Sequence, residues 1–537
     1  MTSADPTSSG PISPSSGDAL RRLRLFLARS PLMRVFAGAR FGDEAVDGAS
    51  GVPDEPWFPS ATPVPGFAEA FYLGRAPLGG HRLELDHPVF EREIDAPEQW
   101  TAVLHGFGWL RPLRDEGTAL AQSNAQVLAG DWIARFGGDL AHAAWDPDTA
   151  ARRLDAWITH RQFLMDGANP ALRKALTRAV AQHVRILRAM AGGTDGLTQA
   201  RIGIALSLAH EALAGRTRGL GVLEQALPKV MADGAPLSRE PRDAVEILCG
   251  LSRIRSAKRA EEAQASEPPF LARAADELAG WLAFLLHRDG TLAQFRGTGW
   301  LPRRALADLV PSGRPSPRAK SVAGGLARLE GPGGAVVIVD ANGTAGQAGW
   351  ASGGAFEMSV PSGRIVVSCG VPEREGALRD ALKGAAAHST FCADDPDGEA
   401  SLPLPEAAAL QTDDASLRLA ARHGALLHRR ELAFLPEGLA GTDEVEGEGK
   451  GVLRFHLHDE VRAALAGDHA VDLSLADGAA RWTFHCVDRP VRLEATVLFA
   501  ESAGEWSRGV GRASKQIVVD LEAGNALRWM IVPRGAG

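Results

Sequence analysis

His388 is the residue whose setting most favours chemistry. It lies in segment 384–391, which reads Gly-Ala-Ala-Ala-His-Ser-Thr-Phe, so that one imidazole follows a run of small residues. Small residues let backbone or a ligand approach closely, and an imidazole changes its charge near neutral pH. We therefore take His388 as the first candidate for proton transfer or for organising a site. The residues leave open an alternative, a histidine that only packs or hydrogen-bonds on a sheet.

The other histidines are weaker candidates. His160 lies near the end of a predicted helix, where it either points into a cleft or caps the helix. His456 and His458 fall on one face of a predicted strand, but a zinc site needs more ligands and the neighbouring sequence supplies none. His428 precedes two arginines and indicates a charged cluster on a sheet face. We keep His160 as a candidate for substrate binding.

Several other kinds of chemistry lack their motifs. The sequence contains no Walker loop, no Gly-x-Gly-x-x-Gly after a strand, no His-Glu-x-x-His and no Gly-x-Ser-x-Gly. A net charge of −8 argues against a general binder of nucleic acid or anionic membranes. No apolar run reaches the roughly 18 to 20 residues of a membrane span. The cysteines have neither metal-ligand spacing nor a disulfide-dense pattern, which favours small buried thiols: Cys249, Cys369, Cys392 and Cys486.

The elements around His388 are predicted to be strands. The β-branched runs at 335–340 and 363–368 are typical of buried strands, and the alternating segment 355–360 is typical of a half-buried one. Segment 291–295 is a further candidate strand. Runs at 471–475 and 481–486 flank an Asp-Gly turn. Many antiparallel strands with polar turns predict a β-sandwich.

Residues from about 116 to 286 have a helical period instead. Asn169 and Pro170 supply an N-cap and a first-turn proline. An apolar stripe follows them at Leu172, Leu176, Val180, Val184 and Leu187. Pro228 should end or kink a later helix. The tryptophans in and around this region either stack on sugars or pack in a core: Trp109, Trp132, Trp145, Trp157, Trp281 and Trp300.

These patterns divide the chain into four parts. Residues 1–17 are rich in Ser, Pro and Gly and are predicted to be disordered. Residues 18–115 hold a basic amphipathic helix and an irregular arm, 116–315 the helical domain, and 316–537 the sheet domain, with the boundary in a proline-rich segment. Two cores are expected because single cores stop growing near about 250 to 300 residues.

The order of several motifs resembles that of the heparinase II/III-like polysaccharide lyases. The matching segments are 107–114, 233–241, 355–360, 387–390, 428–430, 455–458 and 515–518. The resemblance implies a multidomain α plus β fold, with an N-terminal incomplete α/α toroid of helical hairpins followed by a C-terminal antiparallel β-sandwich. It also implies β-elimination at C4 of a uronate in an acidic polysaccharide. That reaction needs a group that neutralises the carboxylate, a base and an acid.

The sequence departs from the family at its usual catalytic positions. Family imidazoles near the Phe-Glu strand are replaced in segment 348–352, where Trp350 stands, and an acidic residue of the next strand is Ser368. The histidine of the helical motif is Pro236, and no tyrosine follows it because Tyr72 is the single tyrosine. Because neither Trp nor a neutral Ser is a normal zinc ligand, no tightly bound zinc is predicted, and no cofactor is expected.

Arg239 remains in the helical motif. The resemblance makes it the candidate clamp for a carboxylate or sulfate, and the alternative is a structural arginine at a helix end. The candidates are thus His388 and Arg239 for catalysis, with Arg239, His160 and Trp350 for substrate binding. Arg239 and His388 are expected to wall a cleft between the two domains, because ligand sites commonly form at such interfaces.

Two hypotheses follow from the resemblance. The first is a lyase active on an acidic polysaccharide, and the second is a catalytically inactive polysaccharide-binding or envelope-assembly relative. The partner in both is an acidic polysaccharide, with no nucleic acid and no integral membrane span, and a homodimer stays open. The resemblance favours the periplasm or cell envelope, whereas the absence of an ordinary export signal favours the cytoplasm.

Overall fold

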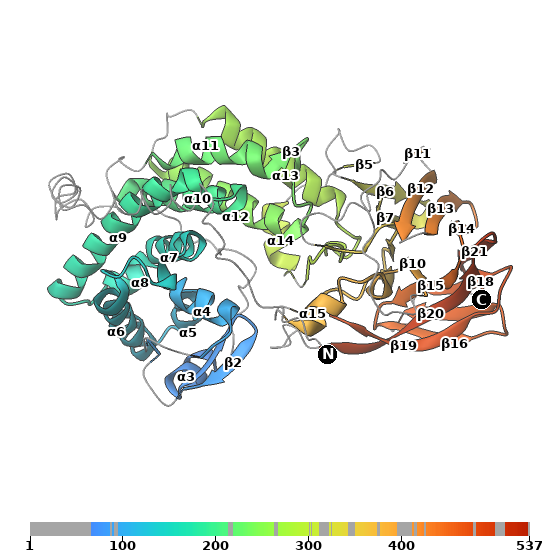
Figure 1. Cartoon of the computed structure of the whole chain (residues 1–537), viewed down its shortest axis with the longest axis horizontal. Coiled ribbons are helices and arrows are strands. Elements are labelled where there is room, and N and C mark those ends of the chain that lie inside the picture. The colour runs from blue at the N-terminus through green and yellow to red at the C-terminus, as the bar shows by residue number, and fades with distance from the viewer. Residues whose placement is uncertain are drawn as a thin grey trace, which may run out of the picture. The chain divides into compact units, whose positions relative to one another are not determined.

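The computed structural model describes residues 66–534 except 86–88, 91–94, 213–217, 262–266, 300, 302, 311–321, 324, 342–348, 373–375, 395–410, 413–415, 424–425, 476–479 and 500–510. The chain forms two compact units (Figure 1). The described residues of the first unit lie within Val89–Ile94 and Thr101–Ala226. Those of the second unit lie within Asp54–Pro88, Asp95–Trp100 and Leu227–Gly537.

The first unit is helical. Its helices are α5 (Leu110–Glu116), α6 (Ala119–Phe136), α7 (Pro147–Thr159), α8 (Arg161–Met165), α9 (Pro170–Met190) and α10 (Gly196–Ala212). Two further helices, α4 (Glu98–His105) and α11 (Gly219–Val230), belong partly to this unit and partly to the second. The predicted cap of α9 is confirmed, because Oδ1 of Asn169 accepts from the N–H of Leu172 at 2.9 Å. Helix α11 ends two residues after Pro228, as expected.

An arginine surrounded by aromatic rings fills the core of the first unit. The guanidinium of Arg153 is fully buried and lies 3.9 Å from the ring centroid of Trp132. Its Nε donates to Nε2 of His183 at 2.8 Å. The tryptophans of this unit pack in the core and are not sugar platforms, since each is at most 2% exposed: Trp109, Trp132, Trp145 and Trp157. Trp281 in the second unit is equally buried, and Trp300 lies outside the described residues.

The second unit combines helices and sheets. Its helical elements are α3 (Phe67–Tyr72), α12 (Pro241–Glu261), α13 (Pro269–Phe284), α14 (Arg303–Leu309) and α15 (Ala377–Ala381). Two small hairpins accompany them, β1 (Arg75–Leu78) with β2 (His81–Glu84), and β3 (Met231–Ala232) with β4 (Ala235–Pro236). The β3–β4 hairpin packs on α12 and α13 and leads the chain to Arg239.

Two antiparallel sheets form the rest of this unit. In the first, described strands follow the order β19-β20-β15-β9-β8-β7-β6-β5, and β10 pairs with β15. Their bounds are β5 (Val322–Ala323), β6 (Leu326–Glu330), β7 (Val336–Asp340), β8 (Phe356–Val360), β9 (Gly363–Val367), β10 (Phe391–Ala393), β15 (Lys450–Leu457), β19 (Arg492–Leu498) and β20 (Arg512–Glu522). The predicted strands at 335–340, 355–360 and 363–368 are therefore confirmed as β7, β8 and β9.

The second sheet has the order β11-β12-β13-β14-β21-β18-β17-β16. Its strands are β11 (Gln411–Thr412), β12 (Ser416–His423), β13 (Leu426–Leu435), β14 (Gly438–Glu446), β16 (Val461–Leu465), β17 (Ala470–Leu475), β18 (Arg481–Cys486) and β21 (Ala526–Pro533). The runs at 471–475 and 481–486 pair as predicted.

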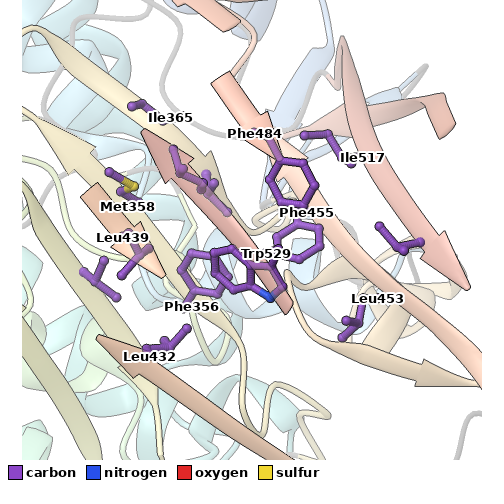
Figure 2. Close-up of a cluster of buried hydrophobic side chains, with 14 of the residues drawn as sticks. Phe356, Met358, Ile365, Leu432, Leu439, Leu453, Phe455, Phe484, Ile517 and Trp529 are labelled. Atoms are coloured by element: carbon purple, nitrogen blue, oxygen red, sulfur yellow. The ribbon is translucent and has the colours of Figure 1, made fainter. Parts of the chain in front are cut away.

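One apolar core lies between these two sheets, as Figure 2 shows. The indole of Trp529 on β21 stacks on Phe356 of β8, with ring centroids 5.5 Å apart. Phe455 of β15 meets Phe484 of β18 at 4.9 Å. Rings from opposite sheets thus interdigitate, which is how a sandwich buries both inner faces. The predicted fold class is confirmed, while the curl of the helices into a toroid stays a prediction.

Strand β8 corrects one expectation. We expected it to be half-buried, but all five residues are buried, including Glu357 and Ser359 at 0% exposure. His287 covers this outer face, since its Nδ1 lies 2.9 Å from Oγ of Ser359. The prediction of a strand at 291–295 is wrong, because this covering segment forms a single bridge between Leu286 and Leu292.

Several predictions fall outside the described part of the chain. The tail at 1–17, the basic helix after it and the domain boundary at 315/316 all lie in segments that the structure does not describe. The domain limits therefore stay predictions. Among the described helices, none is both long and apolar enough to cross a membrane.

Candidate functional site

Arg239 lies in a sharp connection between the β3–β4 hairpin and α12. Its N–H donates to the carbonyl of Pro236 at 2.9 Å, and its φ is +57°. A left-handed conformation is uncommon for a residue other than glycine, and such strain gathers at functional positions. Next to it, Oγ of Ser238 donates to Asp243 at 2.6 Å, which ties the connection to the first turn of α12.

The guanidinium of Arg239 is half-buried beside a second arginine. Burial lowers the pKa of Arg239, the nearby charge of Arg296 lowers it further, and Asp340 raises it. Arg296 is itself held by two hydrogen bonds to Asp340, of 2.9 and 2.7 Å. Within the described residues, Nη1 of Arg239 is buried and has no hydrogen-bond partner. A buried donor of this kind lacks the partner that an anion supplies.

Trp350 connects this region to the sheets. Its Nε1 donates to Oε1 of Glu240 at 3.4 Å, and the guanidinium of Arg379 on α15 lies 5.8 Å from its ring centroid. The indole packs with an apolar group that includes Cys369 and Ala387, and it is 6% exposed. Trp350 thus stabilises the site from inside, and its face is not open to stack on a sugar.

Glu240 follows Arg239 directly in the chain. Burial raises the pKa of its half-buried carboxyl, and the charge of Asp243 raises it further. The hydrogen bond from Trp350 and the charges of Arg379 and Arg242 act in the opposite direction. A carboxyl whose pKa is raised toward neutrality is suited to proton transfer.

His388 is buried on the sheet, with 2% of its surface exposed. Burial lowers the pKa of its imidazole to about 4. Neither ring nitrogen has a hydrogen-bond partner in the described part of the chain, and the same holds for the buried Oγ of Ser368. The two residues lie on adjacent segments, since the N–H of Cys369 donates to the carbonyl of Ala387 at 2.8 Å. This neutral imidazole is enclosed by protein rather than open to a polymer.

Glu357 on β8 holds the covering segment to the sheet. Its Oε2 lies 3.0 Å from Nε2 of His287, and its Oε1 accepts from the N–H groups of Gln294 and Ser368 at 2.9 and 3.1 Å. A carboxylate at 0% exposure is costly unless it is fully hydrogen-bonded. Glu357 therefore organises the frame of the site.

A second buried carboxylate lies inside the sandwich. Asp443 accepts from His428 and Arg430 at 2.6 Å each and from the indole of Trp529 at 2.7 Å. Arg430, with His428, holds the pKa of Asp443 far below its usual range against the opposing effect of burial. We expected His428 and its two arginines to form a sheet-face cluster. Only Arg429 is on the surface, where it pairs with Glu446, because alternate residues of a strand face opposite sides.

The predicted site residues fall in different parts of the molecule. Arg239, Trp350 and His388 belong to the second unit, and both Glu240 and Ala387 contact or pack with Trp350. His160 belongs to the first unit, where it is the C-cap of α7 and is 7% exposed. The cleft between Arg239 and His388 and the roles of these residues stay predictions.

Sequence reasoning missed Glu240, Arg296 and Asp340. Glu240 follows Arg239 in the motif, and this position next to a candidate residue could have marked it as a further candidate. No local pattern pointed to Arg296 or to its pairing with Asp340, 44 residues away in the chain. In the described residues, no group of three or more His, Cys, Asp or Glu side chains is placed to hold a metal ion. None of the four cysteines, all of which lie in the described part of the chain, forms a disulfide.

The chain matches known proteins by family and by fold. Residues 313–530 match the family described as heparinase II/III-like, C-terminal. The structure is similar to heparinase III (TM-score 0.69, 13% identity), with coverage of 97% of this chain and 92% of that one. It is also similar to the heparinase III BT4657 gene product with methylated lysines (TM-score 0.62, 14% identity, coverage 97% and 91%).

A third similar structure is a mutant of the heparan sulfate lyase HepC from Pedobacter heparinus (TM-score 0.60, 15% identity, coverage 97% and 89%). No curated protein matches the chain by sequence. Identities this low show a shared fold. Residues 313–530 of the second unit thus match the heparinase II/III-like C-terminal family, and the chain shares the fold of heparinase III over nearly its whole length.

Proposed function

We propose that this protein acts on an acidic, uronate-containing polysaccharide by β-elimination, with Arg239 binding the uronate carboxylate. The observation that carries the proposal is the guanidinium of Arg239, half-buried in a left-handed turn with a buried Nη1 that no described residue engages. An anion at this group would complete its hydrogen bonds. The heparinase III fold supplies the reaction class, since the similar proteins are named as heparinases and a heparan sulfate lyase.

The chemistry at Arg239 is charge neutralisation. Binding the carboxylate lowers the negative charge that would otherwise resist removal of the C5 proton. Arg296 is held by two hydrogen bonds to Asp340 and keeps a second positive charge close to Arg239. In this proposal His388 takes no part in proton transfer, because its imidazole is enclosed, with 2% of its surface exposed.

A second candidate function is binding without catalysis. Trp350 stands where the family resemblance places an imidazole, and its indole fills a packed apolar group. The single tyrosine, Tyr72, ends α3 near the start of the described chain, away in sequence from the motif around Arg239. A protein that kept the guanidinium of Arg239 but lost the family's usual proton-transfer groups would bind an acidic polysaccharide without cleaving it. Its role would then be polysaccharide binding or envelope assembly.

The test is an assay on a panel of uronate polymers, sulfated and unsulfated, that follows the absorbance of the unsaturated product. Binding of the same polymers is measured by calorimetry. Arg239→Ala should weaken binding by about 10-fold or more, since a charge-assisted hydrogen bond contributes roughly 1.5 to 3 kcal/mol. Arg429→Ala, a surface arginine on β13, is the matched control. Binding without product would select the second function, and neither binding nor product would refute both.

A further inference from the structure

We propose that Glu240 is the proton-transfer group of this site, taking the proton from C5 of the uronate and delivering it to the departing O4. The inference rests on the proposed function and deepens it, because it assigns the group that replaces the missing tyrosine. It arises from the geometry at the start of α12, where Glu240 follows Arg239 directly and its side chain lies against Trp350.

The first argument is position. Arg239 and Glu240 are consecutive, and both side chains are half-buried. A substrate carboxylate bound at Arg239 would therefore lie at the residue that precedes the proposed base. His388, by contrast, is 2% exposed and enclosed by the sheet, so a polymer has no access to its ring nitrogens.

The second argument is which oxygen atoms are free to act. The indole of Trp350 holds Oε1 of Glu240 at 3.4 Å. Within the described residues, Oε2 has no hydrogen bond and is not enclosed. The nearby acids are committed elsewhere, because Asp340 is bound by Arg296 and Ser352, and Asp243 accepts from Ser238. Glu240 is thus the carboxyl beside Arg239 that can exchange a proton with a substrate.

The third argument is the electrostatic setting. Four groups face the carboxyl: Asp243 on α12, Arg242 on α12, Arg379 on α15, and the indole of Trp350. Burial and Asp243 together outweigh the two arginines and the hydrogen bond, so that the pKa of Glu240 lies above its ordinary value of 4.5. A carboxylate with a raised pKa is a stronger base toward the C5 proton, and its protonated form can then act as the acid for O4.

The step balances without another reactant. The Glu240 carboxylate takes the C5 proton, and the electron pair of the C5–H bond forms the C4=C5 double bond. The C4–O4 bond breaks, its electrons move to O4, and O4 takes the same proton from Glu240. The products are an unsaturated uronate and a free hydroxyl, and Glu240 ends as the carboxylate that began the cycle.

The kinetic test uses Glu240→Gln, which keeps the acceptor for Trp350 and removes the exchangeable proton. Turnover on the polymer that wild type cleaves should fall by about 10²- to 10⁴-fold, with polymer binding within about threefold of wild type. Asp243→Asn should move the acidic limb of the wild-type pH profile to lower pH, because it removes a charge that raises the pKa of Glu240. Glu446→Gln on β14 is the control.

A second readout does not depend on activity. The Trp350 indole contacts Glu240, so the tryptophan fluorescence of wild type minus that of Glu240→Gln should titrate above pH 4.5. Trp350→Phe should abolish this difference, and thermal melts check that every variant is folded.

The outcomes separate the two proposals. Wild type without eliminase activity on any uronate polymer removes the proposed function and this assignment together. An active wild type with Glu240→Gln at near-normal turnover, or a fluorescence difference that titrates at or below pH 4.5, removes the assignment alone. Loss of turnover with binding retained, together with a titration above pH 4.5, supports both.

Discussion

The indole of Trp350 donates to the carboxyl of Glu240 at 3.4 Å, which joins two residues 110 positions apart in the chain. One of them precedes β8 of the sandwich, and the other precedes the first residue of α12. Through this contact the start of α12 meets an indole that packs with Cys369 and Ala387. The position of the Glu240 side chain therefore depends on how Trp350 packs.

Gly297 should be the most sensitive glycine near this contact. A Cβ added there would lie 2.5 Å from Cζ2 of Trp350, and the φ of Gly297 is +73°. We expect Gly297→Ala to lower the free energy of unfolding by roughly 2 to 5 kcal/mol, the sum of left-handed strain and overpacking. Denaturant unfolding measures it.

Gly290→Ala is the matched control for Gly297. Its φ is +78°, but nothing lies within 4 Å of an added Cβ. It should therefore cost only the conformational part, about 1 to 2 kcal/mol. Equal losses in the two variants would show that Trp350 does not press against Gly297.

Asp443 should be among the costliest single positions in the sandwich. Asp443→Ala leaves His428 and Arg430 buried without their shared carboxylate, and removing one partner of a buried ion pair costs about 3 to 5 kcal/mol. Chemical denaturation of the variant measures the loss. Glu446→Ala on the same strand breaks an exposed pair with Arg429 and should cost about 1 kcal/mol or less. Similar losses in both variants would contradict the buried network.

Acid should destabilise the protein well above the pKa range of carboxylates. Burial keeps several histidines neutral, and an unfolded chain takes up protons on them below pH 6.5. Their stabilising effect is complete above pH 6.5 and is lost as the pH falls toward the folded pKa, at about 1.4 kcal/mol per pH unit for each imidazole. The pKa is lowered to about 4 for His388, about 3 for His105 and His456, and about 2 for His458.

The measurement is the denaturant midpoint between pH 7 and pH 5. We expect a continuous fall in stability over this range, with a smaller slope in His388→Gln. His485→Gln, at an exposed position on β18, is the control variant. A flat profile from pH 7 to pH 5 would contradict the expectation, because it would mean that the folded and unfolded chains take up the same number of protons over this range.

His388→Ala separates catalysis from packing. If His388 transfers a proton, turnover should fall by about 10²- to 10⁴-fold with stability maintained. Its burial leads us to expect the other result, a loss of roughly 1 to 3 kcal/mol in unfolding free energy with no specific kinetic effect. Thermal melts paired with eliminase assays distinguish the two. A large kinetic loss in a fully stable variant would return the proton-transfer role to His388.

The amino-acid sequence by itself determined the local elements. The β-branched runs became β7 and β9, Asn169 capped α9, and Arg239 fell just before a helix start. These features depend on neighbouring residues, because periodicity, caps and turn residues act over a few positions. The order of the motifs was also enough to indicate the family, since that order is a property of the chain.

Tertiary structure decided which polar groups are buried and what they meet. Glu357 alternates with apolar residues as a solvent-facing position would, yet His287 covers it from 70 residues away. His388 follows small residues as an open site would, yet it is enclosed. The carboxyl of Glu240 accepts a hydrogen bond from Trp350, 110 residues away in the chain. Each of these outcomes depends on long-range packing between elements, which determines the dielectric and the partners of a charge and which no local pattern encodes.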